Sequence, residues 1–345
     1  MLRQDFLNTL KIVYPALGGP KSILPILSNF CFDGKYVLAC DDAVAMRTRC
    51  ELELQGGLPG QLLVSMLSAS SAEEVDFSYD EDQSVSLLLG RTKLKMPKMD
   101  VSDVYKRLPK SRDIAEGQPV PITEDIVKAL RLAARVGSTD VQTISRSGVT
   151  VRFDNKKTYF YSTNGMALAV ATAKNSTPDL AGTSVILPKR FCDLLLTLAA
   201  KSLTITSDGG LVAATKLVQL FGAQPATADY KQFDSILDQS ISEGDSAVAL
   251  PRQLTTCLQR STILTPDLVR LAYSQGRLSI VSTGGGSEIT DSLKIDLGGK
   301  PFSVLTDAAS VLKYLDVATR IDITPDRIVL LGEGLVVLIA VQGDN

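Results

Sequence analysis

The chain has 345 residues, of which 45% are apolar and 21% charged, and its formal net charge is −2. This composition is ordinary for a globular protein, and no apolar run approaches the roughly 18 residues that would span a membrane. Any contact with DNA requires a localised basic patch, because the chain as a whole is not basic. The sequence contains no histidine, which excludes Ser-His-Asp and Cys-His triads and histidine-bearing zinc sites.

The cysteines indicate a reducing compartment. Their number is odd and no two of them form a CxxC pair, so we expect buried free thiols rather than disulfides. The N-terminal residues 1–13 predict an amphipathic helix with charges in it, not a signal peptide. We therefore expect a cytoplasmic protein. The cysteines are Cys31, Cys40, Cys50, Cys192 and Cys257.

The first third of the chain predicts a helix, a hairpin, a second helix and a closing hairpin. The helix over residues 1–13 has its apolar positions on one face, and Gly-Gly-Pro ends it. A hairpin follows over residues 27–54, and a short helix over 62–67. The sequence EEVDFSYDEDQSVSLLLG predicts the closing hairpin, and the polar stretch 109–118 predicts a linker.

The middle third opens on a helix that Thr123 is expected to cap. Its apolar positions fall in one arc at about 100° per residue, namely Ile126, Val127, Leu130, Ala133 and Ala134. Its basic positions fall in a narrow neighbouring arc, namely Lys128, Arg131 and Arg135. These side chains either form a solvated face with snorkelling stems or contact phosphates.

The last third repeats the same order of elements. A helix begins near Pro251, a hairpin follows, and a second helix spans residues 306–317. The segments RIDITPDRIVLL and GLVVLIAVQ predict the final strands.

The three hairpins indicate an internal repeat. Their second strands end at Asp42, Asn164 and Gly284, so the spacings are 164 − 42 = 122 and 284 − 164 = 120 residues. Similar units at one period must be recognised before the fold is assigned. We expect three domains of an α+β fold, over residues 1–116, 117–243 and 244–345.

No catalytic, metal or cofactor motif stands out. The sequence has no Walker A motif, and no GxGxxG lies between a strand and a helix. Residues 284–286 favour a plain glycine loop over a phosphate loop, because no helix pattern follows them. Asp41 and Asp42 favour a solvated strand end over a metal ligand pair. We expect a protein that is not an enzyme.

Four segments carry a resemblance to a known family. They are LPILSNF (24–30), GRTKLKMP (90–97), STNGMALAV (162–170) and ADYKQFDSIL (228–237). Their order, together with the repeat, resembles the bacterial-type DNA polymerase sliding clamp, the beta subunit of the replicative polymerase. The resemblance covers nearly the whole chain.

Three segments depart from the family pattern. Met166 and Ala167 stand where the family usually has His-Arg, and Ala228 stands where it has Pro. Residues 339–342 are Ile-Ala-Val-Gln in place of the usual Met-Pro-Met-Arg. Such divergence is typical of a phage-encoded or otherwise remote clamp, which would act in the host cytoplasm.

The resemblance implies a processivity factor that performs no chemistry. Sheets would lie outside and helices inside, and two chains would join head to tail into a ring around double-stranded DNA. The implied partners are the DNA polymerase, the clamp loader and a second copy of the chain. The residues implied to face the DNA are Lys21, Lys128, Arg131 and Arg135.

The resemblance also implies a pocket for a linear peptide of the polymerase or the loader. Its implied residues come from three stretches: Thr163, Gly165, Met166 and Leu168; Ala228, Gln232 and Phe233; Val337 and Ile339. Leu168, Val337 and Ile339 could equally be core strand residues. Met166 and Phe233 are the stronger candidates for the pocket rim.

Two other functions remain open at this point. A structural oligomer built from repeats, such as a virion component, would have no DNA role and no positive potential in its hole. An enzyme with a carboxylate or lysine site would need a pocket with convergent polar groups.

Overall fold

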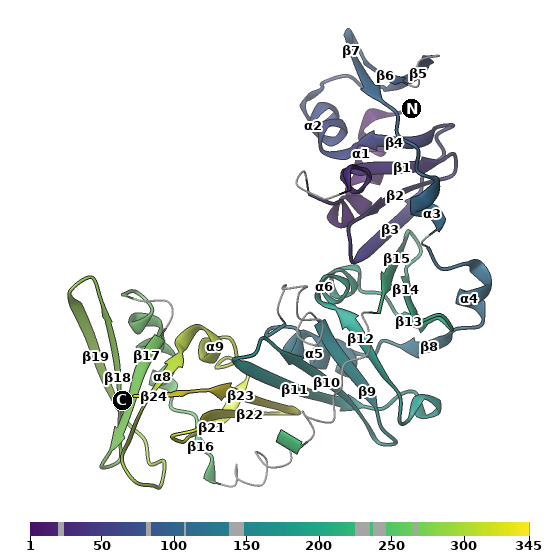
Figure 1. The fold of residues 1–345 in the computed structure, drawn as a ribbon. Coiled ribbons are helices and arrows are strands. Elements are labelled where there is room, and N and C mark those ends of the chain that lie inside the picture. The colour runs from purple at the N-terminus through teal and green to yellow at the C-terminus, as the bar shows by residue number, and fades with distance from the viewer. Residues whose placement is uncertain are drawn as a thin grey trace. The chain divides into compact units, whose positions relative to one another are not determined.

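The computed structural model describes residues 1–19, 24–80, 84–106, 108–137, 148–224, 235–236, 246–264 and 268–344. The chain forms two compact units (Figure 1). The first unit comprises residues 1–122 and 190–224, and the second comprises residues 123–189 and 225–345. Each unit contains one eight-stranded antiparallel sheet and one smaller sheet. The predicted α+β class with antiparallel sheets is confirmed.

The first unit is built around a sheet of order β4-β1-β2-β3-β15-β14-β13-β8. Its strands are β1 (Asn29–Asp33), β2 (Tyr36–Cys40), β3 (Val44–Arg49), β4 (Gln55–Pro59), β8 (Gln118–Pro121), β13 (Ser202–Ile205), β14 (Gly210–Ala214) and β15 (Val218–Ala223). A three-stranded sheet contains β5 (Asp76–Asp80), β6 (Ser84–Leu89) and β7 (Thr92–Pro97). The helices are α1 (Arg3–Val13), α2 (Gly60–Ala69), α3 (Ser102–Lys106), α4 (Ser111–Ala115) and α6 (Lys189–Leu198). Helix α6 belongs to the first unit from Arg190 onward.

Helix α1 packs on α2 and on the strands β2 and β3. Phe6, Leu10 and Val13 are buried on one face of α1, as their spacing predicts. The rings of Phe6 and Phe77 pack edge to face at a centroid distance of 5.4 Å. The core of this unit therefore lies between the helix pair and the sheets.

The second unit is built around a sheet of order β12-β9-β10-β11-β23-β22-β21-β16. Its strands are β9 (Gly148–Phe153), β10 (Lys157–Thr163), β11 (Ala167–Lys174), β12 (Ser184–Pro188), β16 (Val248–Ala249), β21 (Ala318–Ile323), β22 (Arg327–Gly332) and β23 (Leu335–Ala340). A five-stranded sheet contains β17 (Leu268–Ser274), β18 (Arg277–Gly284), β19 (Ser287–Lys294), β20 (Phe302–Asp307) and β24 (Gln342–Gly343). The helices are α5 (Glu124–Ala133), α8 (Arg252–Ser261) and α9 (Ala308–Leu312).

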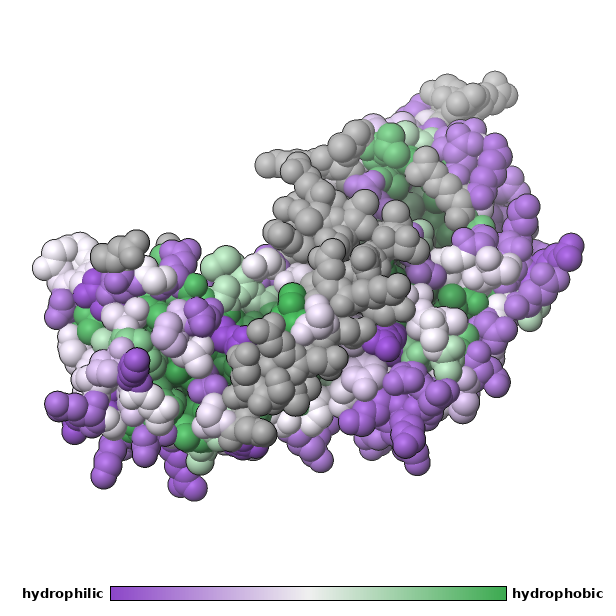
Figure 2. Space-filling model, turned by 60° about the horizontal axis from the view of Figure 1, so that its bottom comes forward, coloured by the Kyte–Doolittle hydropathy of each residue, from purple (hydrophilic) through white to green (hydrophobic). Residues whose placement is uncertain are grey.

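Helix α5 packs on β10 and β11, and α8 packs on β18 and β19. Phe160, Ala169 and Ala171 are buried in the two strands beneath α5. Outside such cores, the face in Figure 2 shows apolar residues in groups between hydrophilic ones. Among the helices that the structure describes, none combines the length and the apolar character of a membrane span.

Each large sheet joins strands from two of the three predicted domains. Strand β3 pairs with β15, and β11 pairs with β23. Pairing between strands that are far apart in sequence satisfies backbone groups that each predicted domain would otherwise leave at a sheet edge. The two compact units therefore cross the predicted boundaries near residues 116 and 243, and the three-domain division stays a prediction.

Candidate nucleic-acid interface and partner-peptide site

Helix α5 carries the predicted basic arc. The Thr123 hydroxyl accepts a hydrogen bond from the amide of Ile126 at 3.3 Å, so the predicted N-cap is confirmed. Ile126 and Leu130 are buried, whereas Lys128 and Arg131 are exposed. The helix thus buries an apolar stripe against the sheet and leaves two cations on the surface.

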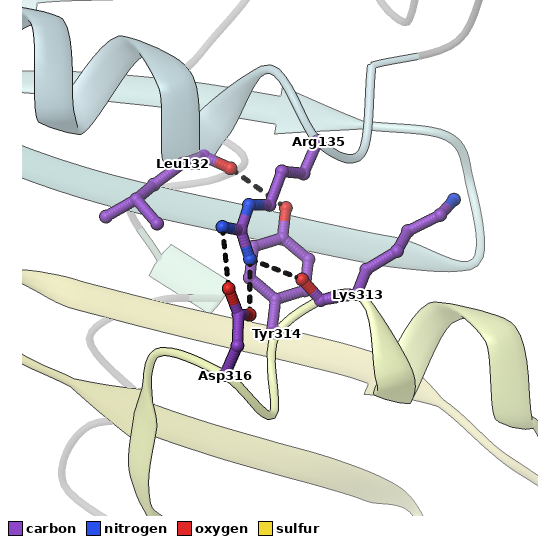
Figure 3. Close-up of polar contacts among 5 residues, drawn as sticks. All are labelled: Leu132, Arg135, Lys313, Tyr314 and Asp316. Carbon is purple, nitrogen blue, oxygen red and sulfur yellow. Dashed lines mark hydrogen bonds and ion pairs between the residues drawn. The ribbon is translucent and has the colours of Figure 1, made fainter. Parts of the chain in front are cut away.

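Arg135, just beyond α5, is engaged within its own unit (Figure 3). Its guanidinium donates two hydrogen bonds to the carboxylate of Asp316, at 2.6 and 3.0 Å, and one to the carbonyl of Lys313 at 2.6 Å. It also lies over the ring of Tyr314, whose hydroxyl donates to the carbonyl of Leu132 at 3.1 Å. These contacts join the end of α5 to the turn after α9.

The charges at this junction stabilise each other. The hydrogen bond from Arg135 holds the pKa of Asp316 below its usual value, and the same bond raises the pKa of Arg135. The side chain of Arg135 is 27% exposed and that of Asp316 62% exposed. Arg135 is therefore less available to a phosphate than its place in the basic arc predicts.

The other two cations of the arc differ in their contacts. Lys128 forms an ion pair of 2.8 Å with Glu333, and both side chains are largely exposed. Such a pair is weak in water and exchanges readily for another anion. The side chain of Arg131 has no hydrogen bond or ion pair within the described ranges. Lys21 lies outside the described residues.

A groove beside α5 adds three cations that the basic arc does not include. It encloses about 350 Å³, and Lys156, Lys157 and Lys174 line it together with Lys128. The first two stand in the β9–β10 turn and at the start of β10, and Lys174 ends the adjacent β11. The Lys-Lys pair in the sequence could have indicated them, but only the pairing of β10 with β11 brings Lys174 beside Lys157.

The predicted peptide segment forms a tight turn between β10 and β11. The carboxamide of Asn164 accepts hydrogen bonds from the amides of Met166 and Ala167, at 3.0 and 2.8 Å. Gly165 has φ 91°, a conformation that favours glycine. Thr163 accepts from the amide of Gly165 at 3.1 Å. Met166 is left 39% exposed at the tip of the turn.

Strand register separates the predicted pocket residues into two faces. Leu168 pairs with Leu338, and both belong to one apolar cluster on one face of the sheet. Val337 and Ile339 flank Leu338 in β23, so their side chains point to the opposite face, where they are 0% and 1% exposed. The structure thus places Leu338 beside Leu168 and does not place Val337 or Ile339 there.

The remaining predicted pocket residues have no described position. Ala228, Gln232 and Phe233 lie outside the residues that the structure describes. The backbone amide of Ala340 donates to the carbonyl of Met166 at 2.8 Å, so the end of β23 reaches the turn. The described part of the candidate peptide site therefore consists of Thr163, Gly165, Met166, Leu168 and Leu338.

No model of a known protein family and no curated protein matches the chain. Solved structures match it over nearly their whole length. A putative DNA polymerase III beta subunit from Eubacterium rectale has a TM-score of 0.79 at 13% identity, over 99% of this chain and 98% of that chain. A DNA polymerase sliding clamp from Caulobacter crescentus has 0.77 at 16%, over 100% and 99%. The Helicobacter pylori beta clamp bound to a DNA ligase peptide has 0.70 at 16%, over 99% and 98%.

The chain has the fold of the beta sliding clamps. The predicted resemblance is confirmed at the level of the fold, although the identity is low. The clamp fold also accounts for two ambiguous motifs. Gly285 and Gly286 have φ 58° and 78° in the turn between β18 and β19, which makes them hairpin residues. Asp41 accepts from the amides of Ala43 and Val44, both at 2.8 Å, and so shapes a strand end.

Within the described parts of this clamp fold, no group of three His, Cys, Asp or Glu side chains is placed to hold a metal ion. The five cysteines are buried, and none of them forms a disulfide. Burial raises the pKa of Cys50 to about 11 and raises that of Cys31 further. Both thiols therefore stay protonated at neutral pH.

Proposed function

We propose that this protein is a DNA sliding clamp, a processivity factor that encircles double-stranded DNA and tethers a DNA polymerase. The observation that carries the proposal is the match of the whole chain to whole beta clamps, with TM-scores of 0.70–0.79. In this proposal two chains join head to tail into a ring, and a clamp loader opens it. The clamp performs no chemistry of its own.

A primer-extension assay tests the proposal. The polymerase and loader encoded by the same genome extend a primer on circular single-stranded DNA, with and without this protein and with a trap that captures dissociated polymerase. We expect longer products per binding event only when the protein is present. Product lengths that do not change with loader and protein both present contradict the proposal.

The DNA face of the proposed clamp is centred on Lys128 and Arg131. Phosphate contacts from exposed cations are independent of sequence and weaken steeply with salt. Lys21 and Arg135 remain in the proposal, but Arg135 is unsuitable for charge reversal because its guanidinium also holds Asp316. The three groove lysines 156, 157 and 174 extend the same basic surface.

A paired charge reversal tests this face. Lys128→Glu with Arg131→Glu should shorten clamp-dependent products and lower the salt slope of DNA binding by about two, one for each phosphate contact. The control is Lys35→Glu with Lys216→Glu, which makes the same charge change at exposed turn positions of the first unit. Equal losses in both variants contradict the assignment of α5 to the DNA face.

The proposed partner site accepts an apolar linear peptide against Met166, Leu168 and Leu338. The Helicobacter pylori clamp binds a DNA ligase peptide, which supports peptide binding by this fold. Burial of one large apolar side chain contributes about 1.5–3 kcal/mol. A charge at the exposed tip should therefore weaken peptide binding at least about tenfold.

Fluorescence polarisation measures this effect. The probe is a labelled peptide from the C-terminus of the DNA polymerase encoded by the same genome. We compare Met166→Glu with Leu62→Glu, which alters a side chain of similar exposure, 42%, on α2. Unchanged affinity in Met166→Glu shows that the peptide site lies elsewhere.

A further inference from the structure

A second groove lies in the first unit, where β3 runs beside β15. It encloses about 350 Å³, which is within the range of ligand pockets. Leu27, Ala45, Val104 and Phe221 line it and belong to one buried apolar cluster. Leu24 also lines the groove and is 40% exposed. The groove therefore offers an apolar floor that a ligand side chain can reach.

This groove occupies the same place in its sheet as the candidate peptide site does in the second unit. Asp41 accepts hydrogen bonds from the amides two and three residues further on, as Asn164 does. The backbone amide of Asp41 donates to the carbonyl of Val44, and that of Asn164 to the carbonyl of Ala167. The two turns are thus equivalent at a spacing of 164 − 41 = 123 residues, one more than the sequence comparison predicts.

The strand register extends the equivalence to the apolar floor. Ala45 pairs with Phe221 in the first unit, and Leu168 pairs with Leu338 in the second. Each pair belongs to an apolar cluster on its sheet. The repeat has therefore produced two similar surfaces, but the second pair consists of two leucines whereas the first combines a small side chain with a phenylalanine.

The groove of the first unit differs from the candidate peptide site of the second unit most in its charge. Four carboxylates line it, namely Asp41, Asp42, Asp103 and Asp208, and no lysine or arginine is among its described lining residues. Arg190 pairs with Asp41, and Lys106 pairs with Asp103.

The other two carboxylates are not neutralised by contact. Asp42 and Asp208 have no ion pair within the described ranges. The carboxylate of Asp208 accepts hydrogen bonds from the Thr206 hydroxyl at 2.5 Å and from the amide of Gly210 at 3.3 Å. The positive charge of Lys110 acts on Asp208 without a direct contact. The rim of the groove is therefore acidic in the folded chain.

We propose that this groove binds an extended segment of a partner protein in which one large apolar side chain is flanked by lysine or arginine. The apolar side chain enters the floor against Ala45 and Phe221, and the flanking cations face Asp42 and Asp208. Gly209 also lines the groove, and its lack of a side chain leaves room for the peptide backbone to approach closely. The proposal goes beyond the partner site above, because the two sites lie in different units.

A peptide array tests the chemistry of the ligand. The array holds heptapeptides with Leu, Phe or Met beside two or three Lys or Arg residues, with matched sets in which Glu replaces the cations or Ser replaces the apolar residue. The full chain should retain the basic apolar set at least about fivefold better than either matched set. Equal retention of all three sets overturns the proposal.

A tryptophan reporter locates the binding. The chain contains no tryptophan, so Leu24→Trp places a single indole in the lining of the groove. Titration with the best-retained peptide should shift the emission of Leu24→Trp and leave that of Met166→Trp, in the other unit, unchanged. A shift only in Met166→Trp overturns the proposal and leaves the partner site of the proposed function intact.

Charge variants test the rim. Asp42→Lys with Asp208→Asn should weaken binding of the same peptide at least about fivefold at low salt, because rim charges act through screened attraction. The control Asp179→Lys changes an exposed acid of the second unit and should bind like the parent chain. Asp42→Asn alone should have a smaller effect in the same direction. Equal affinities in all variants overturn the assignment of the rim.

Discussion

At the scale of single residues, Arg135 combines a charge with a fixed position. Its guanidinium spans Asp316 and the carbonyl of Lys313, and it covers the buried ring of Tyr314. A planar guanidinium can make such paired bonds, whereas a lysine ammonium cannot. Arg135 therefore contributes to the stability of the second unit as well as to its charge.

Removal of this ion pair should lower stability in a pH-dependent way. The pKa of Asp316 is lowered in the folded chain, so the pair contributes fully above the ordinary pKa of about 3.9. Its contribution is lost as the pH falls through the lower folded value. Asp316→Asn should cost roughly 0.5–1 kcal/mol at pH 7, because the pair is partly exposed.

Urea unfolding of the parent chain and of Asp316→Asn at pH 7 and pH 3 measures the difference. The gap in unfolding free energy should narrow at pH 3. The control is Glu333→Gln, which removes the exposed ion pair with Lys128. It should change the free energy of unfolding less than Asp316→Asn does at both pH values. A gap that widens toward acid contradicts this role of Arg135.

The cysteines make a second prediction at this scale. All five are buried and none forms a disulfide, and buried structural thiols react slowly with disulfide reagents. Ellman's reagent should react slowly with the native chain and should titrate five thiols in urea. Rapid reaction of several thiols in the native chain contradicts the burial of these residues.

At the scale of elements, the start of α5 depends on one hydroxyl. Thr123 caps the helix that buries Leu130 against β10 and β11 and that presents Lys128 and Arg131. The first amides of a helix have no partner within it, and a capping side chain satisfies one of them. The position of the basic face therefore depends on this cap.

Thr123→Ala should destabilise the chain by about 1 kcal/mol, and Thr123→Ser should restore most of that loss. Thermal unfolding followed by circular dichroism measures both variants. Equal melting temperatures for the alanine and serine variants contradict a capping role, because only serine retains an acceptor oxygen.

At the scale of the whole molecule, the proposed function requires two chains to join head to tail. Strand β7 is an edge of the three-stranded sheet in the first unit, and β19 is an edge of the five-stranded sheet in the second unit. A strand of a second copy could pair with either edge. Head-to-tail contacts close into a ring only when the rotation that relates one subunit to the next brings the last subunit back to the first. The five- and three-stranded sheets are thus the candidates for subunit contacts.

Sedimentation velocity at micromolar concentration should show a homodimer. A proline at the centre of an exposed edge should convert it to monomer without unfolding the chain, because proline removes a ladder donor. Ser292→Pro in β19 is one such variant, and Lys216→Pro, in the exposed turn between β14 and β15, is the control. A parent chain that sediments only as a monomer contradicts spontaneous closure of the ring.

The sequence alone determined the repeat, the class of fold, the buried stripe of α5 and its cap. These features depend on local periodicity and on the chemistry of one turn, which neighbouring residues specify. The resemblance in four short segments added the clamp fold, which the structural matches confirm.

Only the tertiary structure decided which side chains meet. The pairing of β11 with β23 places Leu338 rather than Val337 or Ile339 beside Leu168, because a shift of one residue in a strand turns every side chain to the other face. The partner of Arg135 lies 181 residues away, beyond any local pattern. The acidic groove between β3 and β15 combines segments around residues 24–45, 103–109 and 208–224, and no single one of them shows it, since distant strand pairing alone brings them together.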